Sequence, residues 1–261
     1  KYYNIILSKV FSRSISFHHI FSFCNKLMKN KLLYEKIVSS TNDRVKEIKI
    51  NFKKSSSFGL ISEKQLNGRG RKGNEWISQK GDLTCSFLIN KSFNIKHFGK
   101  INIIISVIVC KVLAKEFPEL EFKLKWPNDI FLKKKKIAGI LIETSIIKKK
   151  IEYLIIGFGL NVVSEPVAKD YKTTSLKRYT NKIDNNVIFK RVFKSLEKNL
   201  SEQSIKSFKD FKDYWISISK DIGKKIRVKK MNSFVTGVFE TIDEDGSLVL
   251  NFNSQKEIVE F

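Results

Sequence analysis

Residues 125–141 read KWPNDIFLKKKKIAGIL, and this stretch predicts a rigid turn between two apolar strands. Pro127 lies between an aromatic residue and an Asn-Asp pair, which fixes a tight turn and holds an amide and a carboxylate in set directions. Lys136 opens the apolar run that follows, so its ammonium can reach back towards the turn. The alternative is that Lys136 is one more solvated lysine of the run 133–136, and position alone does not separate the two.

The chain on both sides of this turn alternates short β-like runs with helical runs. Apolar residues at helical spacing predict one long helix over 97–116, the clearest element of the set. A Ser/Thr/Asn cluster at 39–42 is typical of the start of a helix. We expect strands at 33–38, 59–63, 83–89, 130–132, 137–144 and 153–158, one more ending at 125, and helices at 43–48, 97–116, 185–201 and 205–218.

The pattern changes after Gly223 to short strands with alternating polarity. Residues 243–246 read Asp-Glu-Asp-Gly, a sequence typical of a hairpin turn. This tail has the size of a small five-stranded barrel. We therefore expect a large domain over 31–220 and a small β-barrel domain over 221–261.

The composition is strongly basic, with 50 Lys and Arg against 26 Asp and Glu, a formal net charge of +24. Such a charge is typical of nucleic-acid binding. However, Ile, Asn, Phe and Lys dominate the whole chain, which indicates a general compositional bias and a solvated lysine coat. We expect no specific nucleic-acid partner.

Three scattered cysteines, Cys24, Cys85 and Cys110, are too few for a disulfide framework and form no zinc-binding pattern. The longest apolar run, 101–113, contains polar residues and is shorter than the roughly 20 residues that cross a bilayer. We expect a soluble, cytoplasmic protein without a membrane partner.

Residues 1–34 contain six basic residues and no acidic one, a composition typical of an organelle transit peptide. A second interpretation is that Met28 is the natural start and that residues 1–27 are an upstream extension. We favour the second because the motif-bearing part begins directly after Met28. On either interpretation, residues 1–30 are a leader outside the folded domains.

Residues 68–73 read GRGRKG and predict a loop that handles anions. Its three glycines let the backbone approach a ligand closely, and Arg69, Arg71 and Lys72 supply donors for phosphate or carboxylate oxygens. The spacing is not that of a Walker loop. Taken alone, the segment is equally typical of a general RNA-binding or solvated loop.

Residues 156–161 read IGFGLN and predict the end of a strand. The two glycines leave room for a flat ligand, and Asn161 offers both a donor and an acceptor. Two glycines before an asparagine are a weak signal when they stand alone.

Taken in order, the motifs closely resemble those of the biotin protein ligase family. The set is SSTN at 39–42, Q(x)2GRGRKG at 65–73 with Trp76 shortly behind, KWPND(x)6KIAGIL, and GFGLN. The resemblance implies an α+β fold with a mixed β-sheet and flanking helices, similar to class II synthetases, and a small C-terminal SH3-like β-barrel. Lipoate and octanoate transferases share this fold but lack the GRGR[RK]G and KWPND strings. No helix-turn-helix pattern precedes the SSTN segment, so we expect the monofunctional form.

The resemblance also implies roles for particular residues. Lys136 and Arg71 would be catalytic. The biotin-binding residues would be Ser40, Thr41, Asn42, Gln65, Arg69, Gly70, Arg71, Trp76, Lys136 and Gly139. The ATP-binding residues would be Arg69, Arg71, Lys72, Asn128, Asp129 and Asn161. No protein cluster for a metal is expected; Mg²⁺ would arrive with ATP, with Asp129 as its candidate neighbour.

The implied reaction is ATP-dependent activation of biotin as biotinyl-5'-AMP, followed by transfer to a lysine of the biotin carboxyl carrier domain of acetyl-CoA carboxylase or a related carboxylase. A carboxylate that attacks a phosphate brings two anions together, so cationic side chains are the residues that this chemistry needs. A closed loop would shield the adenylate from water. No Ser-His-Asp or Cys-His set is evident, which fits a reaction without a covalent enzyme intermediate.

Some features depart from the family or leave alternatives open. Ser39 stands where the family often has an acidic or other polar residue, and Leu66-Asn67 stands where small or polar residues are common. The chain ends at Phe261, short of the last family strand, so we expect an abbreviated barrel. A lipoate-type acyl ligase and a basic nucleic-acid-binding module without enzymatic activity are the alternative functions. A monomer and a homodimer are equally compatible with the sequence.

Overall fold

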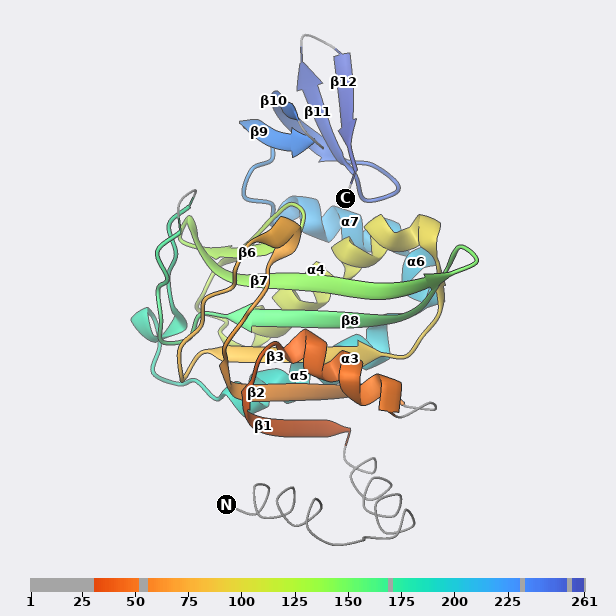
Figure 1. Cartoon of the computed structure of the whole chain (residues 1–261). Helices are drawn as coiled ribbons and strands as arrows, with labels where there is room; N and C mark the ends of the chain where they lie inside the picture. The colour runs from red at the N-terminus through yellow and green to blue at the C-terminus, as the bar shows by residue number, and fades with distance from the viewer. Residues whose placement is uncertain (1–30, 52–55, 169–170, 231–232, 253–254, 261) are drawn as a thin grey trace, which may run out of the picture.

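The computed structural model describes residues 31–51, 56–168, 171–230, 233–252 and 255–260. The predictions for a leader over residues 1–30 lie outside these described residues. Within them, the chain forms one large sheet covered by helices on both faces and a separate smaller sheet (Figure 1).

The large sheet is mixed, as predicted. Its strands follow the order β1-β2-β3-β8-β7-β6-β5, and β4 pairs with β8 beside this path. Only β1 and β2 run parallel, and the other pairs among these described strands are antiparallel. The strands are β1 (Leu32–Val38), β2 (Phe58–Gln65), β3 (Leu83–Ile89), β4 (Phe93–Asn94), β5 (Phe122–Lys125), β6 (Asp129–Leu132), β7 (Lys135–Ile147) and β8 (Lys150–Leu160).

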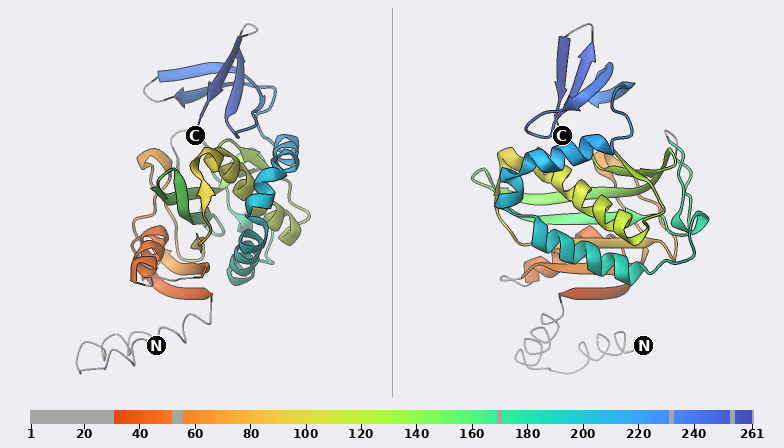
Figure 2. Two further views of the ribbon diagram at one scale, coloured as in Figure 1. Left: turned by 90° about the vertical axis from the view of Figure 1, so that its right-hand side faces the viewer. Right: turned by 180° about the vertical axis from the view of Figure 1, so that it is seen from behind.

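Helices cover the two faces of this sheet unequally. α3 (Thr41–Asn51) packs on one face, over β2, β3 and β8. α4 (Phe98–Glu116) and α5 (Asn185–Asn199) cover the other face, with α6 (Glu202–Lys206) and α7 (Phe208–Ser217) beside them (Figure 2). α3 leaves part of its face of the sheet uncovered. A ligand can therefore reach the sheet on that face.

α4 is the central helix of the core. The segment Ile95–Glu116 is long and apolar enough to cross a membrane by length and composition alone. In the structure, eleven residues of α4 are buried, and the helix packs between the sheet and the helices α5 and α7. Its apolar composition is therefore accounted for by the core.

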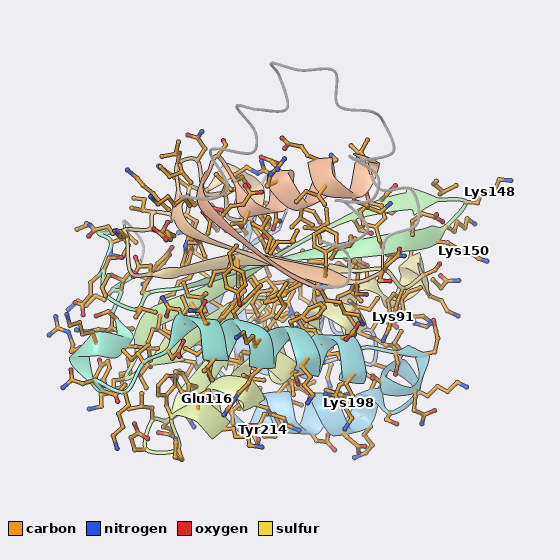
Figure 3. All side chains as sticks on the ribbon, turned by 90° about the horizontal axis from the view of Figure 1, so that it is seen from below. Lys91, Glu116, Lys148, Lys150, Lys198 and Tyr214 are labelled. Carbon is orange, nitrogen blue, oxygen red and sulfur yellow. The ribbon has the colours of Figure 1, made fainter. Side chains whose placement is uncertain are left out.

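Three predicted elements differ from the structure. The single helix predicted over 205–218 is two helices, because Ser207 leaves helical geometry (ψ 27°) between α6 and α7. The strands predicted over 137–144 and 153–158 extend into one long hairpin, β7–β8, whose turn has left-handed φ angles at Lys148 and Lys149. Figure 3 shows Lys148 and Lys150 at this outer end of the sheet.

The smaller sheet contains four strands among the described residues, one fewer than the five predicted. They are β9 (Lys225–Lys230), β10 (Ser233–Ile242), β11 (Leu248–Phe252) and β12 (Gln255–Val259), all antiparallel and in the order β12-β11-β10-β9. The turn at 243–246 contacts the turn between β5 and β6 of the large sheet, where Trp126 Nε1 donates to Gly246 O at 3.2 Å. Gly246, at φ 88°, lies so close to Gly99 that a Cβ would come within 2.7 Å of its backbone.

Candidate active site

A cavity of about 150 Å³ opens on the sheet face next to α3. It collects segments that are far apart in the sequence: the start of α3, the end of β2, the loop that follows β2, the 125–129 turn, and the glycine-rich parts of β7 and β8. All predicted site residues except Lys72 and Asn161 line it, namely Ser40, Thr41, Asn42, Gln65, Arg69, Gly70, Arg71, Trp76, Asn128, Asp129, Lys136 and Gly139.

One end of the cavity is a buried hydrogen-bonded turn at the start of α3. The backbone N–H of Thr41 donates to Gln65 Oε1 at 2.8 Å. Ser86 Oγ, from β3, lies 2.7 Å from Thr41 Oγ1 and 2.6 Å from Asn42 Oδ1. Asn42 Nδ2 donates to Glu143 Oε2 at 2.7 Å. These polar side chains are held by protein partners before any ligand binds, so this end of the cavity is preorganised.

Trp76 forms the wall between the two ends of the cavity. Its indole lies directly on Gly159, where a Cβ would overlap the ring, and a Cβ on Gly139 would come within 3.1 Å of it. A Cβ on Gly157 would come within 2.6 Å of Asn42 Oδ1. The glycines therefore make room for these protein side chains, whereas the sequence predicted room for a flat ligand.

The other end of the cavity is cationic. Lys136 Nζ lies 2.7 Å from Asp129 Oδ1, and the two side chains are only 11% and 18% exposed. The ammonium also lies over the rings of Trp76 and Tyr171, 5.6 and 4.7 Å from their centroids. These contacts fix Lys136 in one place. Lys136 is therefore not simply one more solvated lysine of the run 133–136.

Arg71 adds a second charge at this end. Burial lowers the pKa of its guanidinium, while the charge of Asp129 acts in the opposite direction. An arginine stays protonated under such a shift. A partly desolvated cation of this kind is well placed to attract an anionic ligand.

The loop after β2 is tied down at its start and turns sharply in its middle. Arg69 donates to Asp43 and, at 3.0 Å, to Glu143, and the hydrogen bond to Asp43 raises the pKa of the guanidinium. Lys72 and Gly73 have left-handed φ angles of 54° and 78°. Gly70 has φ −104° and lies in extended backbone, so its conformation is open to any residue.

Lys72 points away from this cavity. Its Nζ donates to Lys229 O on β9 at 3.4 Å. It lines a second cavity of about 470 Å³ between the 125–129 turn and the smaller sheet. Arg71 and Asn128 border both cavities, so the two are neighbours. The left-handed turn at Lys72 directs its ammonium away from the first cavity, whereas Arg71 borders both.

Asn161, for which the family resemblance implied an ATP-binding role, is 3% exposed and lines neither cavity. Its Nδ2 donates to Thr174 O at 3.1 Å and so fixes the segment that follows β8. Within this segment, Glu165 forms a two-point ion pair with Arg178 at 2.6 and 2.7 Å, which lowers the pKa of Glu165 to about 2. The segment carries Tyr171 to its position beside Lys136.

The sequence missed other residues that shape the site. Asp82 Oδ1 accepts hydrogen bonds from the backbone N–H groups of Val162, Val163 and Ser164 at 2.9–3.0 Å, fixing the end of β8. Ser86 and Glu143 were missed as well. Alternation along β3 was the available signal for Ser86, and the lone charge in the apolar run 137–147 was the signal for Glu143.

The described residues of the site offer neither an activated thiol nor a cluster of metal-ligating side chains. Cys85 lines the cavity, but complete burial raises the pKa of its thiol well above the usual value. The described residues contain no group of three or more His, Cys, Asp or Glu side chains placed to hold a metal ion. The arrangement is suited to binding a polar ligand at one end and neutralising anions at the other.

Known proteins resemble this chain in sequence and in fold. Residues 34–161 match the model of the biotin/lipoate A/B protein ligase family. The biotin protein ligase from Aquifex aeolicus, solved in complex with biotin and ATP, is 30% identical, with a TM-score of 0.73 over 88% of this chain and 95% of that chain.

The chain belongs to the biotin/lipoate A/B protein ligase family. Among curated members of this ligase family, the biotin--[acetyl-CoA-carboxylase] ligase of Mycobacterium tuberculosis is 29% identical over 77% of this chain and 75% of its own length. The bifunctional ligase/repressor BirA of Bacillus subtilis is 27% identical over 89% of this chain and 73% of its own length. The predicted family, ligase activity and fold class are confirmed.

Proposed function

We propose that this ligase activates biotin with ATP as biotinyl-5'-AMP and transfers the biotinyl group to a lysine of a biotin carboxyl carrier domain. The observation that carries the proposal is the joining of two unlike ends in one cavity. A neutral, hydrogen-bonding end at Thr41, Asn42 and Gln65 lies next to a cationic end at Arg71 and Lys136.

The hydrogen-bonding end suits the ureido ring of biotin. That ring carries one carbonyl acceptor and two N–H donors in a compact unit, and hydroxyl and amide groups in a closed pocket complement it. The indole of Trp76 would then flank the aliphatic tail. The tail would place the ligand's carboxylate at the cationic end.

The cationic end suits the reacting anions. Lys136 would exchange part of its contact with Asp129 for the biotin carboxylate and the α-phosphate of ATP. Arg71, which borders both cavities, would contact the phosphates, and the second cavity with Lys72 would receive the rest of the nucleotide. Mg²⁺ would enter with the nucleotide phosphates. Asp129, which lies beside Lys136 in the cavity, is the carboxylate that would contact it.

In the first step, a biotin carboxylate oxygen attacks the α-phosphorus of ATP. The new bond is the mixed anhydride P–O bond, and the bond to the bridging oxygen breaks, so that pyrophosphate leaves with the electron pair. Negative charge concentrates on the phosphoryl oxygens in the transition state. Fixed cations such as Lys136 and Arg71 stabilise that charge without reorganising at the moment of reaction.

In the second step, the neutral ε-amine of the carrier lysine attacks the activated carbonyl. A C–N amide bond forms, AMP leaves with its oxygen, and the amine releases a proton. The loop at 68–73 covers the cationic end and limits the access of water to the anhydride.

The experiment uses the whole chain with Mg-ATP, labelled biotin and a generic biotin carboxyl carrier domain. We expect biotin-dependent pyrophosphate release without the carrier, recovery of biotinyl-5'-AMP, and label on one carrier lysine when the carrier is present. A parallel arm replaces biotin with lipoate. No pyrophosphate release with biotin would refute the adenylation step, and release with lipoate alone would assign the chain to lipoate ligation.

A further inference from the structure

Tyr171 lies beside Lys136, although the two residues are far apart in the sequence and Tyr171 belongs to none of the motifs. The Lys136 ammonium lies over the tyrosine ring, 4.7 Å from the ring centroid. Tyr171 lines the first cavity and is 36% exposed. The ring therefore shares the cationic end of the cavity with the side chain that faces the reacting anions.

The backbone of Lys136 itself fixes the place of this ring. Lys136 N donates to Lys172 O at 2.8 Å, and Thr174 N donates to Lys136 O at 3.0 Å. The buried amide of Asn161 holds the same segment, because its Nδ2 donates to Thr174 O at 3.1 Å. The residue that follows Tyr171 is thus bonded to the strand position that carries the ammonium. The ring and the ammonium are positioned by the same backbone contact.

The reaction asks the ammonium to change partners. In the structure, the Lys136 ammonium is neutralised by the carboxylate of Asp129, 2.7 Å away. In the proposed reaction, it gives up part of this contact for the biotin carboxylate and the α-phosphate. A lysine side chain is long and flexible, so an ammonium that leaves its carboxylate gains freedom unless another group holds it. A displaced cation would stabilise the charge of the transition state less well.

An aromatic ring is suited to holding a cation during such an exchange. The face of the ring carries partial negative charge and attracts the ammonium, but it has no formal charge. A second carboxylate in the same place would repel the incoming anions and compete with them for Lys136. The ammonium also lies 5.6 Å from the centroid of the Trp76 ring, so two rings attract it without opposing the ligands.

We propose that Tyr171 is a positioning residue whose ring face keeps the Lys136 ammonium at the cationic end when the contact with Asp129 is exchanged for the reacting anions. The inference rests on the proposed function, because adenylation is the reaction that brings those anions to Lys136. Tyr171 acts through Lys136 and takes no part in the bonds that form or break.

The first test is Tyr171→Leu in the whole chain, which removes the ring and keeps an apolar side chain. We expect kcat for biotin-dependent pyrophosphate release to fall about tenfold, with the KM for biotin within about threefold of wild type. Tyr171→Phe keeps the ring face and should restore kcat to within about twofold. The matched control is Tyr34→Leu, at a β1 tyrosine that is 47% exposed and meets the Phe189 ring, and it should leave both constants unchanged.

The second test weakens the ring face while nearly keeping its shape. Phenylalanine carrying one, three or five ring fluorines is placed at position 171 by nonsense suppression, because fluorine withdraws charge from the face of the ring. We expect kcat to fall stepwise with each addition, in total about fivefold. A ring that only fills space would give the same kcat throughout the series, and this result would overturn the proposal.

The third test is a double-mutant cycle with Lys136→Ala. A ring that acts through the ammonium has nothing to hold in this background, so adding Tyr171→Leu should change kcat by less than about twofold. If Tyr171→Leu again costs about tenfold there, the ring acts directly on the ligand or on the fold, and the positioning role is overturned.

A measurement on the ligand-free chain separates this inference from the proposed function. The ring currents of Tyr171 and Trp76 should shift the ε-methylene protons of Lys136 upfield in NMR spectra, and Tyr171→Leu should reduce this shift, with Lys136→Arg supplying the assignment. An unchanged shift overturns the contact whether or not the chain is active. If wild type releases no pyrophosphate with biotin, the proposed function fails. If wild type is active but Tyr171→Leu keeps the wild-type kcat, only the role of Tyr171 is overturned.

Discussion

The two ends of the cavity are built on opposite plans. At the start of α3, Thr41 and Asn42 are 4% and 3% exposed and are held by hydrogen bonds to other strands. At the other end, Lys136 is 11% exposed and fixed on β7, whereas Arg71 lies on the loop after β2, which turns through left-handed backbone at Lys72. The comparison teaches that a neutral ligand is met by a finished network, whereas anions are met by one cation fixed on a strand and another carried on a loop.

Lys136→Ala should produce the largest effect, because it removes the best-fixed cation of the charged end. We expect biotin-dependent pyrophosphate release to fall about 100-fold, equivalent to about 2.7 kcal/mol of transition-state stabilisation, with a smaller loss of biotin affinity from the missing contact with the carboxylate. Steady-state kinetics and a biotin binding titration check this. Lys135→Ala is the matched control, and equal losses in the two variants would contradict the special position of Lys136.

Arg71→Ala should release the adenylate early. We expect about tenfold faster loss of biotinyl-5'-AMP and more labelling of unrelated lysines, because a charge that retains the phosphate is gone. Mass spectrometry of free adenylate and of added bystander protein measures both. Lys72→Ala should instead raise mainly the KM for ATP, since Lys72 faces the second cavity. Identical behaviour of the two variants would erase the distinction between the cavities.

Gly159→Ala should damage the wall shared by both ends. The added methyl overlaps the Trp76 indole, and forcing the ring aside costs about 1–3 kcal/mol. We expect the KM for biotin to rise about tenfold. Gly70→Ala is the contrast, because at φ −104° a Cβ approaches its nearest neighbour only to 3.4 Å. Kinetic constants within about twofold of wild type are expected for Gly70→Ala.

Glu165→Gln should give the smallest effect, confined to the segment that carries Tyr171. The pKa of Glu165 is lowered to about 2 by Arg178 from an ordinary 4.5. The ion pair therefore stabilises the fold above about pH 4.5, and this contribution is lost as the pH falls through about 2. Melting curves should show wild type ahead by about 2 °C at about pH 7 and no difference near about pH 2. A constant difference across this range would contradict the ion-pair explanation.

The sequence predicted most elements of the fold because their patterns are local. The run at 97–116 has helical periodicity and became α4, and 83–89 became β3 without change. The joint between α6 and α7 escaped prediction because Ser207 is not a helix breaker, and only tertiary packing bends the chain there. The extension of β7 and β8 to residues 147 and 150 depends on cross-strand pairing, which no single strand encodes.

The site was predicted where a motif concentrates its residues and missed where the partners are dispersed. Lys136 and Arg71 lie in recognisable strings. Glu143 and Ser86 belong to different strands and become neighbours of Asn42 only through the register of the sheet. Asn161 belongs to a motif too, but its amide is used by the backbone of Thr174, which spacing cannot reveal.

The contact between Trp126 and Gly246 has a consequence for protein engineering. The indole that donates to this carbonyl belongs to Trp126, two residues before Asn128. The turn that carries Gly246 also lies against Gly99, at the start of α4. Truncating the chain before β9 would expose the Trp126 indole on the larger domain. It would also remove the contact that supports the turn at 125–129, which carries Asn128. A minimal catalytic fragment would therefore need a redesigned surface at Trp126 before it could be expected to stay in solution.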